Sequence, residues 1–245
     1  MNGKKIFFVQ PSSVVQQEYE VLLVPEANQA RRIFQKYPDC LAFLNIDDGF
    51  SEHDWEVLVR ETQADPALAG VKLGILTYNT DPKLAHKYLM EYMLPCGFIK
   101  LSLGLAESTD IVLKVLGANE ARGRRKYLRV HCGPNTKFNY KDSLGKLIDG
   151  SLVDLSSVGM ACVLNSSNEL PLHSKLESIQ LQLKGSLCLV DGVVMGSRPL
   201  EDGSGKAHVV LFDPKIPPVQ KDKIRAYLQW ALQSSIEDQL RSRKV

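Results

Sequence analysis

The sequence of 245 residues lacks long hydrophobic runs, since no stretch approaches the roughly 18 consecutive apolar residues that a membrane-spanning helix needs. Its first segment, Met1–Val9, has neither the longer apolar core nor the small-residue cleavage site of a secretion signal. The five cysteines form an odd set without a C-x-x-C pair, which indicates reduced thiols. Cys132, Cys162 and Cys188 stand in strand-like runs, where we expect them to be buried. The sequence therefore predicts a cytoplasmic protein that does not insert into membranes.

The patterns of catalytic and metal-binding sites are also missing. The five histidines are scattered without metal-ligand spacing to cysteines or acids, and no serine–histidine–aspartate set can be assembled. Gly145-Lys146 lacks the glycine-rich loop that precedes the lysine of a P-loop. We therefore predict that the protein is not an enzyme and has no catalytic residues, metal site or cofactor.

A strong net charge is absent as well, because the formal net charge is only +2 and the hydrophobic and charged fractions of 44% and 24% are ordinary globular values. The near-neutral surface argues against binding a nucleic-acid polymer. One local segment is an exception, with five basic residues and no acid: Arg122, Arg124, Arg125, Lys126 and Arg129. Arginine can bind a phosphate, pair with a guanine edge or stack on a base, so this segment favours a small anionic guanine nucleotide.

Two short motifs supply complementary groups, one cationic and the other with a carboxylate, a hydroxyl and a glycine. The first is R-x-x-x-R preceded by a further arginine, and the second is D-x-S-x-x-G, which begins about 25 residues later. Their residues are Arg124, Arg125 and Arg129 in the first motif, and Asp154, Ser156 and Gly159 in the second.

With these motifs, residues 122–215 resemble the PilZ domain, whose signatures are RxxxR and [DN]xSxxG. The resemblance implies a six-stranded β-barrel that binds cyclic di-GMP, often as an intercalated dimer, and changes its contacts with a neighbouring domain or protein. One departure is Met160, which stands where many family members have a second glycine. We expect it to narrow the room for the base or to alter the ligand stoichiometry.

The resemblance also implies roles for the arginines. Arg125 and Arg129 are expected to contact guanine edges and phosphates, and Arg124 to contact a phosphate or stack on a base. These residues lie in or next to a predicted linker, which can fold over the ligand when it becomes ordered.

The second motif is expected to read the base. Asp154 can accept from the N1–H and N2–H groups of guanine, and Ser156 can donate to the base or to a phosphate. Gly159 is expected to allow a tight backbone turn and close approach of the base. Gly196-Ser197 is a weaker candidate, on position alone.

Residues 1–118 alternate short apolar runs with segments of helical spacing, which predicts an α/β domain with a parallel sheet. The predicted strands are Ile6–Val9, Val21–Val24, Leu41–Ile46, Val71–Leu76 and Phe98–Leu101. The predicted helices are 26–37, 52–64, 82–94 and 106–117, with helix starts at Ser51 and at Asp81-Pro82.

This order of elements resembles a degenerate response-regulator receiver domain. Asp47 or Asp48 follows the third predicted strand, where that family has its phosphoacceptor, and Thr77 and Lys100 close the next two strands. The first strand ends in Val9-Gln10-Pro11-Ser12, without the acidic pair that would hold the magnesium needed for phosphoryl transfer. We therefore expect Asp47 to remain unphosphorylated and to form a solvated turn with Asp48.

From about residue 123 the pattern changes to short strands and glycine turns, which predicts an all-β closed barrel. The predicted strands are Lys126–Cys132, Thr136–Tyr140, Leu144–Asp154, Gly159–Leu164, Lys175–Leu183, Leu187–Met195 and Ala207–Phe212. Gly150 and Asp191-Gly192 count among the turn signals, and a tail helix over 219–243 carries an apolar stripe expected to pack on the barrel. The predicted domains are 1–118, an arginine-rich linker over 119–129, and a PilZ barrel with its C-terminal helix over 130–245.

The leading hypothesis is a cyclic di-GMP receptor that couples the second messenger to domain rearrangement and to binding of a protein partner, with outputs such as motility or virulence. The alternative is a PilZ-type adaptor that binds proteins without a nucleotide. RNA or DNA binding needs aromatic stacking platforms or a basic groove, and Tyr127 alone does not supply one. A phosphorylated regulator is disfavoured by the absent metal-binding acids. The sequence leaves open the partner, the oligomeric state, the ligand stoichiometry and the direction of any domain movement.

Overall fold

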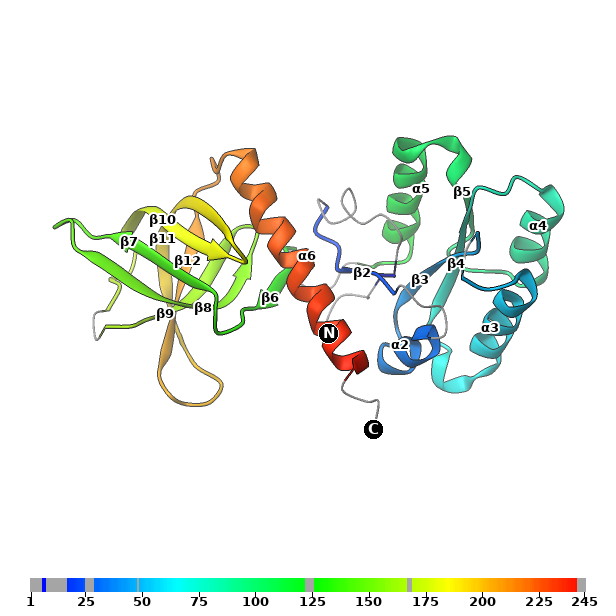
Figure 1. The fold of residues 1–245 in the computed structure, drawn as a ribbon, viewed down its shortest axis with the longest axis horizontal. Helices are drawn as coiled ribbons and strands as arrows, with labels where there is room; N and C mark the ends of the chain where they lie inside the picture. Colours follow the sequence, from blue (N-terminus) through cyan, green and yellow to red (C-terminus); the bar gives the residue numbers. More distant parts are fainter. Residues whose placement is uncertain are drawn as a thin grey trace. The chain divides into compact units, whose positions relative to one another are not determined.

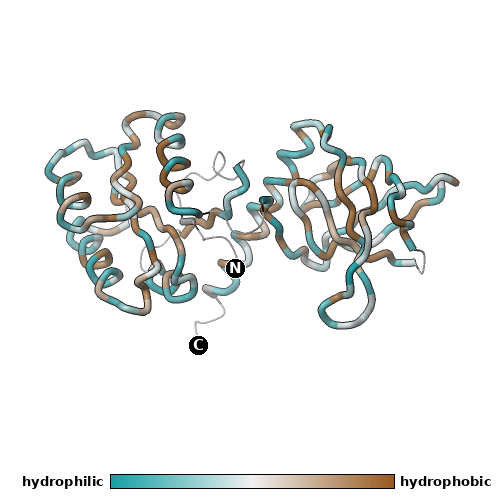
Figure 2. Tube along the Cα trace, turned by 180° about the vertical axis from the view of Figure 1, so that it is seen from behind, coloured by the Kyte–Doolittle hydropathy of each residue, from teal (hydrophilic) through white to brown (hydrophobic). Residues whose placement is uncertain are grey.

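The computed structural model describes residues 6–7, 17–24, 29–47, 49–121, 126–166 and 169–241 (Figure 1). The chain divides into two compact units, residues 1–126 with 235–245 and residues 127–234. The first is an α/β unit and the second is a β-barrel. In both units, hydrophobic residues concentrate along the strands (Figure 2). The fold class predicted from the sequence is therefore confirmed, whereas the predicted boundaries at 118 and 129 stay predictions.

The α/β unit is built on a parallel sheet with the strand order β2-β1-β3-β4-β5. This 2-1-3-4-5 order is that of the flavodoxin-like doubly wound sheets. The strands are β1 (Ile6–Phe7), β2 (Val21–Leu22), β3 (Leu41–Asn45), β4 (Lys72–Thr77) and β5 (Phe98–Lys100). The helical segments are α2 (Ala30–Lys36), α3 (Glu52–Ala64), η2 (Pro66–Leu68), α4 (Pro82–His86), η3 (Lys87–Glu91), η4 (Leu101–Leu103) and α5 (Leu105–Ala118).

Both faces of this sheet are covered. Helix α5 lies on one side, where its Val112 and Leu116 join a core cluster with Leu41 and Phe43 of β3, and α3 and α4 lie on the other side (Figure 1). Every residue from Leu41 to Leu44 is buried, because successive side chains point to opposite, covered faces. This is the physical reason why the strands could be recognised as continuous apolar runs.

The predicted helix starts at Ser51 and Asp81 are confirmed. The Ser51 hydroxyl accepts from the Asp54 backbone N–H at 3.2 Å, and Asp81 accepts from the Lys83 N–H at 2.8 Å with Pro82 in the first helical turn. Both caps bind backbone donors that the first turn of a helix leaves without partners.

The predicted helix over 82–94 takes a different form. Helix α4 ends at His86 and continues as the π-helical turn η3, in which the Tyr92 N–H donates to the carbonyl of Lys87. Such a turn inserts one extra residue, which helical periodicity in the sequence does not reveal. The turn carries Tyr88 into the core, and it carries Lys87 to α3.

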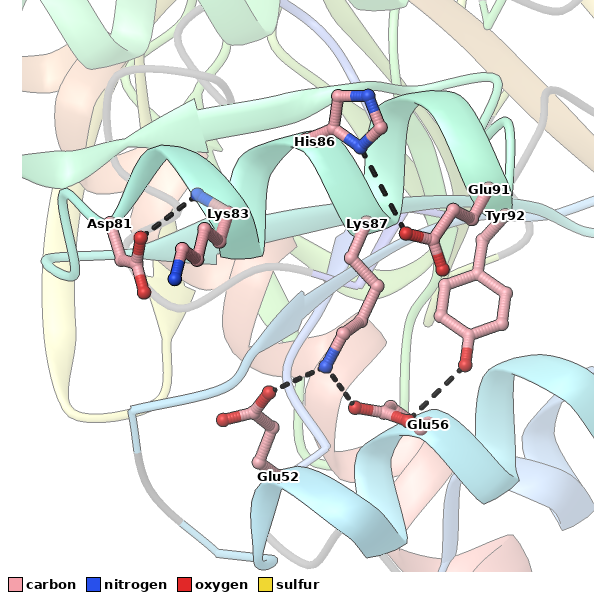
Figure 3. A network of polar contacts seen from close by, with 8 residues as sticks. All are labelled: Glu52, Glu56, Asp81, Lys83, His86, Lys87, Glu91 and Tyr92. Carbon is pink, nitrogen blue, oxygen red and sulfur yellow. Dashed lines mark hydrogen bonds and ion pairs between the residues drawn. The ribbon is translucent and has the colours of Figure 1, made fainter.

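Lys87 links α4 to α3 through a polar network (Figure 3). Its ammonium donates to Glu52 at 2.9 Å and to Glu56 at 2.7 Å, and the Tyr92 hydroxyl donates to Glu56 at 3.3 Å (Figure 3). The hydrogen bond from Lys87 lowers the pKa of Glu56 from its ordinary value, and the two carboxylates raise the pKa of Lys87. The network is a structural tie between two helices on the same side of the sheet.

The second unit is a closed barrel of six antiparallel strands, in which β8 pairs with both β7 and β9. A seventh strand, β6, pairs with β8. The strands are β6 (Arg129–His131), β7 (Lys137–Lys141), β8 (Leu147–Ser156), β9 (Gly159–Leu164), β10 (Lys175–Leu183), β11 (Ser186–Pro199) and β12 (Lys206–Phe212), and the helix is α6 (Pro218–Arg241).

Helix α6 packs on the barrel core with the apolar stripe that the sequence predicts. Its residues Ile224, Tyr227 and Leu228 belong to the core cluster of the barrel, and the Tyr227 and Thr136 hydroxyls are 2.9 Å apart. This packing covers apolar surface that six strands alone would leave exposed.

Two predicted turn signals lie inside strands instead. A Cβ at Gly150 of β8 would lie 2.1 Å from the carbonyl oxygen of Val163, and one at Gly192 of β11 would lie 2.9 Å from that of Leu211. These glycines permit close approach of neighbouring backbones, so in this barrel they mark tight packing and not chain reversal.

The cysteines are all free, and Cys162 and Cys188 are buried in the barrel core as the sequence predicts. Burial raises the pKa of the Cys162 thiol to about 12, which leaves it protonated and unreactive at neutral pH. Cys132, for which burial was also predicted, is half-buried.

Candidate functional site

The two sequence motifs meet on the barrel where β6 pairs with the end of β8. The antiparallel register places Arg129 opposite Ser156 and His131 opposite Asp154. Val130 and Leu155, which alternate with these residues, point into the barrel core. Arg129, Asp154 and Ser156 therefore share the outer face of the barrel, although the motifs are separate in the sequence.

A β-bulge at Val153 is what turns Asp154 outward. Leu152 opposes Cys162, but Asp154 opposes Ala161, so Val153 is an extra residue in β8. The Val153 carbonyl accepts from the Cys132 N–H at 2.9 Å, and the His131 ring nitrogen Nδ1 lies 2.9 Å from the same oxygen. Without the extra residue, alternation from the core residue Leu152 would direct Asp154 inward.

Two guanidiniums flank the Asp154 carboxylate. Arg129 Nε lies 3.6 Å from Asp154 Oδ1, and Arg198 Nη2 donates a hydrogen bond to Asp154 Oδ2. Asp154 is only 7% exposed, whereas the side chains of Arg129 and Arg198 are 43% and 35% exposed. The Asp154 site, defined here as Arg129, Asp154, Ser156 and Arg198, thus has one net positive charge whose donors face solvent.

The sequence comparison decides what kind of barrel this is, because residues 123–230 match the PilZ domain family. These residues form a PilZ domain. The match covers 108 of the 245 residues and includes every residue of the Asp154 site.

Solved structures resemble part of the chain. The PilZ domain of YcgR from Escherichia coli, solved with cyclic di-GMP, is 18% identical with a TM-score of 0.41, and the match covers 50% of this chain and 100% of that one. The MrkH–cyclic di-GMP complex from K. pneumonia is 17% identical with a TM-score of 0.41, covering 50% and 57%. MotI from Bacillus subtilis, an inhibitor of motility, is 16% identical with a TM-score of 0.37, covering 50% and 54%.

The matched region spans about half the length of MrkH and MotI. A comparison with curated protein sequences gave no significant match.

Ser156 of the PilZ motif closes the hairpin that joins β8 to β9. Its hydroxyl donates to the Gly159 carbonyl at 3.0 Å and accepts weakly from the Val158 N–H at 3.4 Å. These bonds satisfy the hydroxyl within a two-residue turn, as serine side chains often do. In this structure Ser156 therefore shapes the hairpin that carries Asp154.

Gly159 has a structural role beyond the one expected for it. A Cβ at this position would lie 2.6 Å from the carbonyl oxygen of Val210, so the glycine allows β12 to approach β9. Met160 is 2% exposed and belongs to the barrel core, and its expected effect on the base or on the ligand stoichiometry stays a prediction. Met160 is therefore not on the outer face with Asp154.

Arg124 and Arg125, the other two predicted arginines, lie outside the described residues. Their assignment to the ligand stays a prediction. Of the arginine motif, the structure places Arg129 at Asp154.

Arg198 was missed by sequence reasoning. The predicted strand ended at Met195, but β11 continues to Pro199. The one signal for Arg198 in the sequence is that it stands alone among the apolar and small residues that follow Val194. Its partner could not be identified from the sequence, because Arg198 and Asp154 are 44 residues apart.

The α/β unit has a second carboxylate at a strand end. Asp47, which follows β3, accepts from the Thr77 hydroxyl and from the Tyr78 N–H at 2.8 Å. Asp47 is exposed and lies in a turn, as predicted, whereas Asp48 lies outside the described residues. Its donors are neutral groups at the end of β4, so they hold the carboxylate in place without compensating its charge. The receiver resemblance and the absence of phosphorylation stay predictions.

Metal-binding and membrane features can be assessed for the described part of the chain. There, no three His, Cys, Asp or Glu side chains gather closely enough to hold a metal ion. Of the helices described, none combines the length and apolar character needed to cross a membrane.

Proposed function

We propose that this chain is a cyclic di-GMP receptor that binds the nucleotide at the Asp154 site of its PilZ domain and acts without catalysis. The observation that carries the proposal is the convergence of two separate motifs, with Arg129 Nε 3.6 Å from Asp154 Oδ1. Membership of residues 123–230 in the PilZ family supports the ligand class.

The charge at the site suits a phosphodiester ligand. Two guanidiniums flank one carboxylate, so the site keeps one formal positive charge, and both arginine side chains are partly exposed. A guanidinium binds phosphate oxygens through parallel, charge-assisted hydrogen bonds. Arg129 is therefore assigned to a phosphate or to the O6/N7 edge of guanine.

Asp154 provides selectivity for guanine. An ionised carboxylate only accepts hydrogen bonds and has about four lone-pair sites, so it can retain an arginine while it accepts from guanine N1–H and N2–H. Adenine presents no such donor pair, which predicts discrimination against cyclic di-AMP. Ser156 and Gly159 form the hairpin and strand contact that hold Asp154 in place.

Arg124 and Arg125 complete the proposed site from the arginine-rich linker over 119–129. Contact between this segment and the ligand would change the arrangement of the α/β unit and the barrel, and thereby a protein-binding surface. Control of motility or virulence through such a partner is the proposed output.

Calorimetric titration of the full chain with cyclic di-GMP, cyclic di-AMP and GTP tests this function. We expect only cyclic di-GMP to bind, with a dissociation constant of about 1 μM or tighter, equivalent to about −8 kcal/mol. Arg125→Ala and Arg129→Ala should each abolish detectable binding. Lys141→Ala is the matched control, because Lys141 pairs with Leu147 at the opposite end of β8 and should leave binding unchanged.

The contrary results are informative. Absence of binding by the wild type would support the nucleotide-independent adaptor. Equal affinity for cyclic di-AMP would contradict the role of Asp154, and equal affinity for a generic oligonucleotide would indicate a nucleic-acid-binding protein.

A further inference from the structure

Arg198 reaches the Asp154 site from a distant part of the barrel sheet. Two strands, β9 and β12, separate β11 from β8. Asp154 of β8 pairs with Ala161 of β9, Ala161 pairs with Val209 of β12, and Val209 pairs with Gly196 of β11. Arg198 is two residues beyond Gly196, so it belongs to the same outer face.

A second β-bulge is needed to place Arg198 there. Val194 opposes Val210, and both are buried in the core, but Gly196 opposes Val209, so Met195 is an extra residue in β11. With strict alternation from Val194, Arg198 would point inward. Gly196 has a φ of +144° and open space where a Cβ would be, which only glycine adopts readily.

Three strands of the barrel depart from regular pairing, β8, β10 and β11, and the departures in β8 and β11 act at the same place. The bulge at Val153 turns Asp154 outward, and the bulge at Met195 turns Arg198 outward to meet it. Bulges commonly re-aim a side chain near a functional site. Their coincidence here indicates that the position of Arg198 is part of the site's construction.

The pair contributes little to stability by itself. Ion pairs that are partly exposed contribute little to stability, because ordering long side chains costs entropy and water screens the charges. The Arg198 side chain is 35% exposed, and only its Nη2 donates to Asp154. A guanidinium has five N–H donors, so most of them remain for another acceptor.

We propose that Arg198 is a fourth ligand-binding arginine, which contacts a phosphate of the cyclic dinucleotide while Asp154 holds it in orientation. This inference rests on the proposed function. In it, the ligand lies on the outer face between Arg129 on one side and Arg198 on the other, above the strands that carry Ala161 and Gly196. Gly196 has no side chain on this face, and Val209 lies between it and Ala161.

The test compares Arg198→Ala, Arg198→Lys and Lys206→Ala with the wild type by calorimetry with cyclic di-GMP. Arg198→Ala should weaken binding by about tenfold or more, and Arg198→Lys by less, since it keeps the charge and loses the fork of donors. Lys206→Ala is the matched control, because it also removes one positive charge. Lys206 lies on β12 opposite Pro199, next to Arg198, and its ammonium is paired with Glu169. Lys206→Ala should keep the wild-type affinity within about twofold.

Thermal unfolding of the same variants separates binding from folding. Arg198→Ala should unfold close to the wild-type temperature, since the ion pair is partly exposed. Wild-type or tighter binding by Arg198→Ala would overturn the inference, because Arg198 would then only occupy the carboxylate. If Arg198→Ala fails to fold, the binding affinity of Arg198→Lys is the deciding measurement. Undiminished binding by Arg198→Lys would overturn the inference, because the fork of guanidinium donors would then make no difference to the ligand. Failure of the wild type to bind cyclic di-GMP would instead refute the proposed function.

Discussion

Each unit of this protein carries an aspartate at the end of a strand, and the two carboxylates have opposite surroundings. Asp47 is exposed and accepts from a hydroxyl and a backbone N–H, both neutral. Asp154 is nearly buried and lies between two guanidiniums. A carboxylate with neutral donors keeps its negative charge and orders a turn, whereas one shared by two arginines leaves a surplus positive charge that attracts an anion. The cations around the carboxylate, and not the carboxylate itself, therefore distinguish the proposed nucleotide site from a structural turn.

The largest expected effect concerns ligand binding by the two aspartates. Asp154→Ala should weaken cyclic di-GMP binding by about 100-fold, because it removes the guanine acceptor and frees both arginines. Asp47→Ala should leave the affinity unchanged, since Asp47 belongs to the other unit. Calorimetry on both variants measures the difference. Equal losses in the two variants would contradict the comparison.

A smaller effect is expected for glycine substitutions in the two units. Gly159→Ala should destabilise the barrel by about 1–3 kcal/mol, because the added methyl would meet the Val210 carbonyl at 2.6 Å. Gly117→Ala in α5 is the matched change, with no atom within 4 Å of the added methyl, and should stabilise the α/β unit by up to about 1 kcal/mol. Urea unfolding provides both values. A neutral result for Gly159→Ala would show that β9 and β12 tolerate a wider spacing.

The smallest effect is a difference in acid sensitivity between the units. Burial lowers the pKa of His208 in the barrel from 6.5, and the positive charge of Lys206 lowers it further. As the pH falls, this histidine is therefore protonated in the unfolded chain at a higher pH than in the folded barrel. Barrel stability should therefore be greatest above pH 6.5 and fall as the pH drops through the folded-state pKa. In the α/β unit, the pKa of Glu56 is lowered from 4.5 by Lys87, so that stabilisation is complete above pH 4.5 and is lost at lower pH.

Tryptophan fluorescence can follow the two units separately. The chain has two tryptophans, Trp55 on α3 and Trp230 on α6 within the barrel unit, so Trp230→Phe and Trp55→Phe variants each report one unit. His208→Gln should remove the pH dependence of barrel stability just below pH 6.5, where the unfolded chain takes up the histidine proton before the folded barrel does. Lys87→Gln should alter the acid response of the α/β unit only. A response of both units to either variant would contradict the assignment.

The architecture of both units could be predicted from the sequence alone. Runs buried on both faces identified the parallel strands, alternating patterns identified the barrel strands, and the caps at Ser51 and Asp81 identified two helix starts. Such signals are local, because each depends on residues within a few positions of one another. The two PilZ motifs were also recognisable in the sequence, whereas the ion pair of Arg129 with Asp154 became visible only in the structure.

Three features could not be predicted from the sequence and are visible in the tertiary structure: the position of Arg198, the need for Gly159 and the direction of Met160. Each of these depends on which strand lies next to which, and the bulges at Val153 and Met195 reverse the facing that simple alternation predicts. An extra residue in a strand becomes visible only when its partner strand is known, because a bulge is defined by pairing and not by composition.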